Sequence, residues 1–358
     1  MFKTTDTLRT SSVERLLKLW AARYTIDLSS LPLSQQLLSI SFLEKDSPEG
    51  RVKTAAKLKG NLLDLNCQMA WLQTKALHNY IPNVLDFHEA KKITESALLV
   101  YEALLNIYQE EPLCIPSLAI EVSQTVEVSQ TVTHLEKTPL VEFGLSEIEK
   151  LAYKLEPILM AFQEQHMACK DWRALGFMTT QLKFTNKLIM NQVTPIEKIL
   201  LSPYLKFIEE QVALPWQRVC AAGAKYDFNS PILALVEQML PTTEEITRNV
   251  YSQLVELFPY HCSRSGFLTT PTVAQSSRRD LNMFQAYLWL CVLEQSLVPI
   301  EKELLNLCLM VMEKVGVKWS ILKQWTQILI DEVLQHTTPE QKTILLPYTQ
   351  GMQQAFDR

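Results

Sequence analysis

Apolar side chains recur at helical spacing through most of this chain, and residues 51–79 show the clearest example. There, apolar residues follow one another at alternating steps of four and three, while lysines and other polar residues take the opposite side. Such spacing puts the apolar residues on one stripe of an amphipathic helix, which usually faces the core. We therefore predict one helix over 51–79 whose buried stripe consists of Leu58, Leu62, Leu65, Met69, Leu72 and Ala76.

Capping signals mark further helix starts. Ser or Thr followed three residues later by Glu or Gln is typical of a helix N-terminus, and this pattern occurs at Ser11, Ser146, Thr194, Thr242 and Thr338. The caps and the apolar periodicity together predict an all-α fold. The expected helices cover residues 84–109, 146–170, 172–191, 195–222, 231–240, 243–258, 278–297, 300–315, 318–336 and 339–355.

A duplicated hexapeptide suggests how the helices are divided into domains. The sequence Glu-Val-Ser-Gln-Thr-Val occupies residues 121–126 and repeats without change at 127–132, between prolines. A tandem repeat of this kind is typical of a tolerant linker. We predict a multi-helix N-terminal region over 1–111, a variable linker over 112–140 and a larger C-terminal helical domain over 141–358.

Charge is unevenly distributed, although the net charge of −5 is mild. Residues 1–80 carry 11 Lys and Arg against 7 Asp and Glu, whereas residues 81–160 carry 5 against 13. The basic segment could bind a polyanion or could pair with its acidic neighbour. Its candidate anion contacts, at the start of the 51–79 helix, are Arg51, Lys53 and Lys57, for which a solvated polar face is the alternative.

Cysteine usage and hydropathy indicate the compartment. The seven cysteines lie far apart, without a CxxC pair or a spacing suited to zinc. The first residues lack the apolar core of a secretory signal, and the longest apolar run is far shorter than the roughly 20 residues that cross a bilayer. We expect a cytoplasmic protein with no metal and no membrane contact.

Catalytic motifs are missing from the sequence. Only 8 residues are glycine, and neither a GxxxxGK phosphate loop, a GxGxxG turn nor a GxSxG elbow occurs. His166 and Cys169 share one helix face but offer only half of a metal site, and His261 and Cys262 form an isolated pair in a loop. The sequence therefore predicts neither an enzyme nor a cofactor, and a site assembled from distant residues is the alternative.

Two adjacent arginines stand just before the most apolar helix candidate. Ser277 is placed to cap that helix, with Asp280 at its third position. Arg278 and Arg279 oppose the helix dipole unless an anion accompanies them. Arg264, in the preceding loop, could join them. One interpretation is a clamp on phosphates, and the other is that the arginines pair with Asp280 or with the acidic segment.

Residues 308–327 fit a helix-turn-helix unit with Gly316 as its turn glycine. Met312 departs from the pattern, because a small residue normally stands there, and a glycine after a helix is also an ordinary C-cap. The unit would lie within residues 300–336. Its second helix would present Lys318, Lys323, Gln324 and Gln327 to a DNA groove.

Two blocks of sequence carry a family resemblance. Residues 51–80, RVKTAAKLKGNLLDLNCQMAWLQTKALHNY, and 263–294, SRSGFLTTPTVAQSSRRDLNMFQAYLWLCVLE, resemble cyanobacterial regulators of heterocyst differentiation of the HetZ kind. The resemblance implies a cytoplasmic transcription factor. We therefore expect a regulatory DNA-binding protein whose partners are double-stranded DNA and regulatory proteins, with a homodimer also allowed. The rival is a helical adaptor that binds proteins only.

Overall fold

A computed structural model describes residues 40–77, 87–110, 173–213 and 215–357, together with a few isolated residues. The described residues are helical almost throughout, apart from one short two-stranded hairpin, so the predicted all-α fold is confirmed. The chain forms two compact units. The N-terminal unit comprises residues 21–160 and 180–208, and the C-terminal unit comprises residues 1–20, 161–179 and 209–358.

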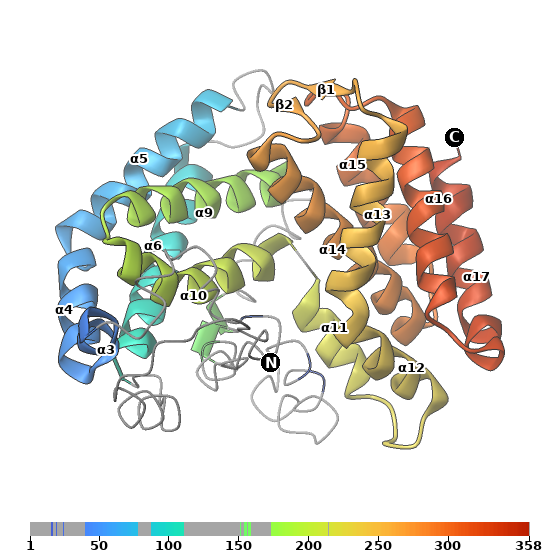
Figure 1. The fold of residues 1–358 in the computed structure, drawn as a ribbon, viewed down its shortest axis with the longest axis horizontal. Helices are drawn as coiled ribbons and strands as arrows, with labels where there is room; N and C mark the ends of the chain where they lie inside the picture. The colour runs from blue at the N-terminus through green and yellow to red at the C-terminus, as the bar shows by residue number, and fades with distance from the viewer. Residues whose placement is uncertain are drawn as a thin grey trace, which may run out of the picture. The chain divides into compact units, whose positions relative to one another are not determined.

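Among the described residues of the N-terminal unit, the first part of the chain forms four helices, and α6 packs against both α4 and α5 (Figure 1). Two later helices, α9 and α10, each contribute to both units. The predicted linker over 112–140 lies outside the described residues, as do Ser11, Ser146, His166 and Cys169. The helices are α3 (Ile40–Asp46), α4 (Pro48–Leu58), α5 (Asn61–Leu77), α6 (Phe87–Glu110), α9 (Arg173–Asn191) and α10 (Pro195–Ala213).

The helix expected over 51–79 is in fact two helices, because the chain turns at Gly60. Gly60 adopts a φ of +70°, a left-handed conformation that favours glycine. The first of the two, α4, also starts earlier than expected. Ser47 caps it, since its Oγ accepts a hydrogen bond of 3.1 Å from the Gly50 backbone N–H.

The break at Gly60 changes which face of α5 is buried. Leu58, on α4, is buried, but the rest of the expected stripe is not: Leu65, Met69 and Leu72 are 53%, 42% and 57% exposed. The opposite face is buried instead, and its polar groups find partners later in the chain: Asn66 Nδ2 donates to Gln192 Oε1 at 2.9 Å, and Gln181 Nε2 donates to the Cys67 carbonyl at 2.7 Å. That buried face consists of Leu63, Asn66, Cys67, Ala70 and Thr74.

The C-terminal unit is built around α14, whose residues from 281 to 293 are all buried. This helix packs against α11, α13 and α17, while α16 packs against α13 and α17 (Figure 1). The elements are α11 (Trp216–Gly223), α12 (Pro231–Met239), η2 (Leu240–Thr242), α13 (Thr243–Leu257), β1 (Cys262–Ser263), β2 (Gly266–Phe267), α14 (Pro271–Glu294), η3 (Pro299–Leu304), α15 (Leu305–Val311), α16 (Trp319–Gln335) and α17 (Pro339–Phe356).

Two of the predicted capping boxes are present. Thr194 pairs with Glu197 and Thr338 with Gln341 through reciprocal hydrogen bonds. Thr242 does not cap α13 with its side chain, because the turn η2 joins α12 directly to α13 and the Thr242 hydroxyl donates back to a carbonyl of α12. The expected helix over 195–222 is also broken, since α10 ends before Pro215 and α11 begins after it.

Candidate functional site

The helix that was expected to begin at Ser277 begins instead at Pro271. Thr270 is extended at the N-cap and proline takes the first helical position, so the polar segment before the apolar run is already helical. Ser277 therefore lies within α14 and is buried at 8% exposure. It cannot cap the helix, and the N–H groups predicted to hold an anion there are engaged within the helix.

The two arginines that follow have different surroundings. The Arg279 guanidinium lies 2.8 Å from the Asp280 carboxylate and 3.6 Å from that of Glu209. Burial alone would lower the pKa of Arg279, but Asp280 and Glu209 outweigh it and raise the pKa. Arg278 is exposed and lies over the Tyr251 ring, 5.1 Å from its centroid. Arg279 is thus an internal ion-pair partner.

Arg51 is fully buried in the N-terminal unit, which excludes the predicted contact with a polyanion. Its guanidinium lies 2.8 Å from Asp46 and donates to the Tyr108 carbonyl and the Tyr204 hydroxyl at 3.1 and 3.2 Å. Burial would lower the pKa of Arg51, but the contacts with Tyr204 and Asp46 raise it. Of the two lysines predicted beside it, Lys53 is exposed.

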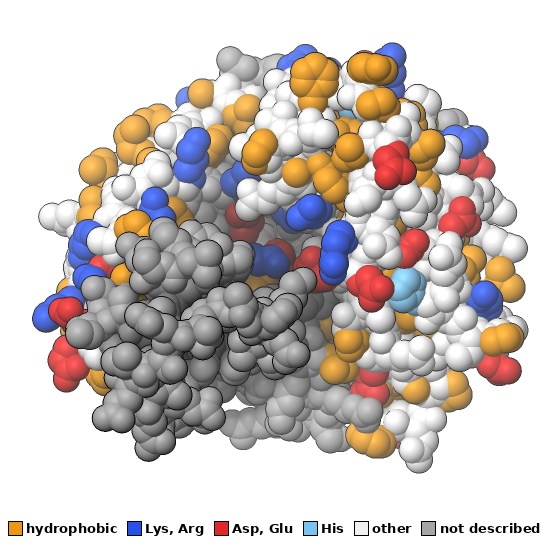
Figure 2. All heavy atoms as spheres, in the orientation of Figure 1, with side chains coloured by type: hydrophobic (Ala, Val, Ile, Leu, Met, Phe, Trp, Pro, Cys, Tyr) orange, Lys and Arg blue, Asp and Glu red, His pale blue; other side chains and the backbone are white. Residues whose placement is uncertain are grey.

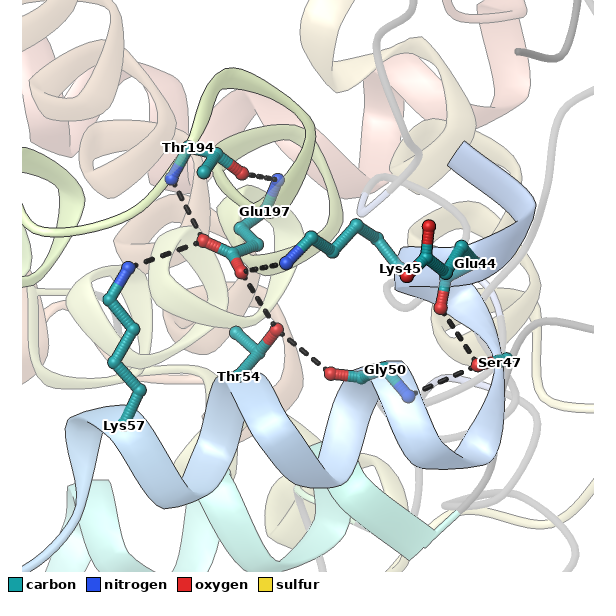
Figure 3. Close-up of polar contacts among 8 residues, drawn as sticks. All are labelled: Glu44, Lys45, Ser47, Gly50, Thr54, Lys57, Thr194 and Glu197. Atoms are coloured by element: carbon teal, nitrogen blue, oxygen red, sulfur yellow. Dashed lines mark hydrogen bonds and ion pairs between the residues drawn. The ribbon is translucent and has the colours of Figure 1, made fainter. Parts of the chain in front are cut away.

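The other predicted lysine, Lys57, is also exposed and belongs to a cluster around Glu197 (Figure 3). The Glu197 carboxylate lies 2.9 Å from Lys45 Nζ and 3.6 Å from Lys57 Nζ, and accepts from the Thr194 backbone N–H at 2.8 Å. Burial raises the pKa of Glu197, but these partners lower it to about 2. The cluster ties α3 and α4 to α10, and its acceptors are satisfied by the protein itself.

Part of the polar face of α16, which was expected to read DNA, contacts α17 and the residue after it. Trp319 Nε1 donates to the Phe356 carbonyl at 3.1 Å, Lys323 pairs with Asp357 at 3.1 Å, and Gln327 accepts from Gln353. Gln324 is exposed, and Lys318 is exposed at the N-cap of α16. Gly316 does form the turn, with a φ of +81°.

A surface that the sequence did not single out lies at the hairpin, and we call it the hairpin edge. It consists of Leu257, Tyr260 and Phe267, which are 55%, 91% and 51% exposed. The exposed cation Arg264 lies in the hairpin, and the exposed cation Lys318 lies in the turn before α16 that the hairpin contacts. Figure 2 shows hydrophobic side chains gathered over β1 and β2 with Lys and Arg beside them. Exposed aromatic residues with arginine are typical of protein interfaces.

Hydrogen bonds hold the backbone of the hairpin edge in place at three points. In the hairpin, Cys262 pairs with Phe267 across the two strands. The Arg264 backbone N–H donates to the Val315 carbonyl at 2.9 Å, which joins the hairpin to the turn before α16, and the Tyr251 hydroxyl donates to the Leu268 carbonyl. The exposed side chains therefore stand on a fixed backbone.

None of the described cysteines forms a disulfide, and most of them are buried. Cys67, Cys220, Cys291 and Cys308 are buried, whereas Cys262, in the hairpin, is exposed. Burial raises the pKa of Cys67 and of Cys291 to about 12. Among the described residues no group of His, Cys, Asp and Glu could hold a metal ion, and no described helix is long and apolar enough to cross a bilayer.

The C-terminal unit carries the match to known proteins. A family model described as phycobilisome protein matches residues 223–357, the segment from the end of α11 through α17. Residues 223–357 are similar to phycobilisome proteins. This match covers less than half of the chain and includes the hairpin edge. No curated protein and no solved structure matches the chain.

The match overturns the functional expectation. The resemblance to heterocyst regulators was wrong, because the family found is a light-harvesting one. The expected DNA-binding role, with double-stranded DNA and regulatory proteins as its partners, is wrong for the same reason. The structure supplies physical reasons: Arg51 and Arg279 are used in internal ion pairs, and Lys323 of α16 pairs with Asp357. The family match points to structural light-harvesting proteins rather than enzymes.

Proposed function

We propose that this chain is a non-catalytic structural component of a light-harvesting assembly, and that residues 223–357 are the module that docks with phycobilisome proteins. The similarity of this segment to phycobilisome proteins carries the proposal. Partners of this kind replace the DNA and the regulatory proteins expected from sequence. The expected cytoplasmic location, which rests on the scattered cysteines, is part of the same proposal.

The hairpin edge is the surface that we propose for this docking. It presents two exposed aromatic rings, Tyr260 and Phe267, on a backbone anchored to α13 and to the turn before α16. Aromatic side chains on a rigid backbone lose little conformational entropy when a partner covers them. The exposed cation Lys318 favours a partner surface with acidic residues at its rim.

Co-sedimentation with isolated phycobilisomes tests the proposal. We expect the purified full chain to sediment with them through a sucrose gradient. A Tyr260→Ala, Phe267→Ala double variant should bind at least about tenfold more weakly, because truncating central aromatic residues costs interfaces the most. The matched control is Phe228→Ala, which removes a ring of similar exposure, 57%, from another part of the module.

Two outcomes count against the proposal. If the full chain stays at the top of the gradient when phycobilisomes are present, the assembly role is wrong. If the chain sediments with phycobilisomes but the double variant does so equally well, the assembly role stands and the hairpin edge is not its contact surface.

A further inference from the structure

The outward face of α5 carries a continuous apolar stripe that no described part of the chain covers. Leu65, Met69 and Leu72 are 53%, 42% and 57% exposed, and Ala76 continues the stripe by one turn. Figure 2 shows hydrophobic side chains at the surface where α5 lies in Figure 1. The buried face of α5 lies opposite, against α6 and α9, so the helix packs with one face and exposes an apolar stripe on the other.

Exposed leucines scattered singly need no explanation, but a row of them on one helix face marks an interaction surface. The spacing of 65, 69, 72 and 76 is the one that brings side chains into line along a helix. The stripe is about 16 Å long, at 1.5 Å per residue. A second helix laid along it would cover all four side chains.

Two charged residues on α5 indicate which helix would cover the stripe. Asp64 and Lys75 flank the stripe on the same side, because eleven residues make about three helical turns. Asp64 stands near the N-terminal end of α5 and Lys75 near its C-terminal end. Neither makes an ion pair with another residue that the structure describes, and the Asp64 carboxylate accepts only the Gln68 amide at 2.8 Å.

We propose that α5 pairs in antiparallel orientation with α5 of a second copy of this chain. In an antiparallel helix pair, each flank of one helix faces the same flank of the other. A twofold axis passing between Met69 and Ala70 then puts each Asp64 opposite Lys75 of the second copy, and the contact is formed twice. The stripe of one copy covers that of the other, and the flanking charges complement each other only in this register.

The contact is small, so the dimer is weak. One helix of 17 residues offers much less area than the interface of a stable complex, and we expect dissociation in the micromolar range. Inside a larger assembly, where copies are held close together, such a contact gains strength from the high local concentration. This proposal does not depend on the proposed function, because α5 lies outside the segment that matches phycobilisome proteins.

Sedimentation velocity of the full chain over a range of concentrations tests the pairing. We expect a concentration-dependent dimer that Leu72→Glu abolishes, because it places a charge in the middle of the seam. The control is Leu99→Glu, which adds the same charge at a site on α6 of similar exposure, 52%, and should leave the dimer unchanged. Both leucines are exposed, so neither change should alter helicity by circular dichroism.

A charge exchange tests the register. Asp64→Lys alone or Lys75→Asp alone should weaken the dimer by about fivefold or more, because each creates two like-charged contacts. The double variant should regain the affinity of the natural chain, since both pairs form again with reversed sign. The proposal is overturned if the chain stays monomeric at about 100 micromolar, roughly the upper end of the expected range. It is also overturned if Leu72→Glu leaves the dimer unchanged. A double variant that stays weak overturns the antiparallel register.

Discussion

The Arg279 guanidinium lies 2.8 Å from the carboxylate of its neighbour Asp280, and this contact decides how an unusual pair of arginines is used. A second carboxylate, Glu209, lies 3.6 Å away on α10. The carboxylates replace the solvent that Arg279 loses on burial. Arg278 stacks over an aromatic ring at the surface instead.

Removing the two arginines separately should therefore have unequal effects. Arg279→Ala should lower the free energy of unfolding by about 1–3 kcal/mol, because it leaves Asp280 and Glu209 close together without their cation. Arg278→Ala should cost only about 0.5 kcal/mol, the value of an exposed cation–π contact. Urea unfolding of the two variants measures the difference. Equal losses would show that Arg279 contributes no more to stability than a surface residue.

The Glu197 cluster should make stability depend on pH in an acidic window. The pKa of the Glu197 carboxyl falls from the usual 4.5 to about 2 in the folded protein, so the folded state binds this proton less readily than the unfolded state. The stabilisation is fully present above about pH 4.5 and is lost as the pH falls toward 2. Glu197→Gln should cost about 2–3 kcal/mol at pH 7 and progressively less below pH 4.5.

The matched control for that experiment is Glu95→Gln, which removes an exposed carboxylate that pairs with Lys91 at 3.6 Å on the same helix. Its effect should be about 0.3–0.5 kcal/mol, as for other exposed pairs of this spacing. If Glu197→Gln lowers stability equally at every pH from 7 down to 2, loss of packing rather than loss of the charge explains its effect.

Gly60 should resist replacement for a reason confined to the backbone. An added Cβ would meet no atom within 4 Å, yet the φ of +70° is unfavourable for other residues. Gly60→Ala should therefore cost about 1–2 kcal/mol, and Gly60→Asn clearly less, because asparagine tolerates this conformation. Thermal unfolding ranks the two variants. An alanine variant as stable as the natural chain would show that α4 and α5 can join without the left-handed turn.

Thiol alkylation should separate the cysteine of the hairpin from the buried ones. Cys262 is exposed, whereas a pKa of about 12 for Cys291 leaves roughly one thiol in ten thousand ionised at pH 8. Iodoacetamide should modify Cys262 within minutes in the folded protein, and Cys291 only after unfolding in urea. Peptide mass mapping identifies the modified sites. Rapid modification of Cys291 in the folded protein would contradict its burial.

The helices themselves could largely be predicted from sequence, because apolar periodicity and capping residues act locally. The capping boxes at Thr194 and Thr338 formed as expected, since each needs only residues within one turn. The start of α14 was predicted too late, because Thr270 followed by Pro271 is also a start signal and the apolar run begins several residues after it. Hairpin aromatics such as Tyr260 and Phe267 stood in a polar loop without periodicity, so the hairpin edge was missed as well.

By itself, the sequence determined that this chain is helical and where most of its helices end. Hydrogen bonds within one turn and the backbone preferences of proline and glycine contribute most of the free energy that decides those points. Tertiary structure alone decided which faces are covered. α5 has apolar residues on two sides. Gln181, 114 residues away from Cys67, donates to the Cys67 carbonyl on one side, and Leu65, Met69 and Leu72 on the other side stay exposed. In the same way, the tertiary structure places Arg279 in ion pairs with Asp280 and Glu209.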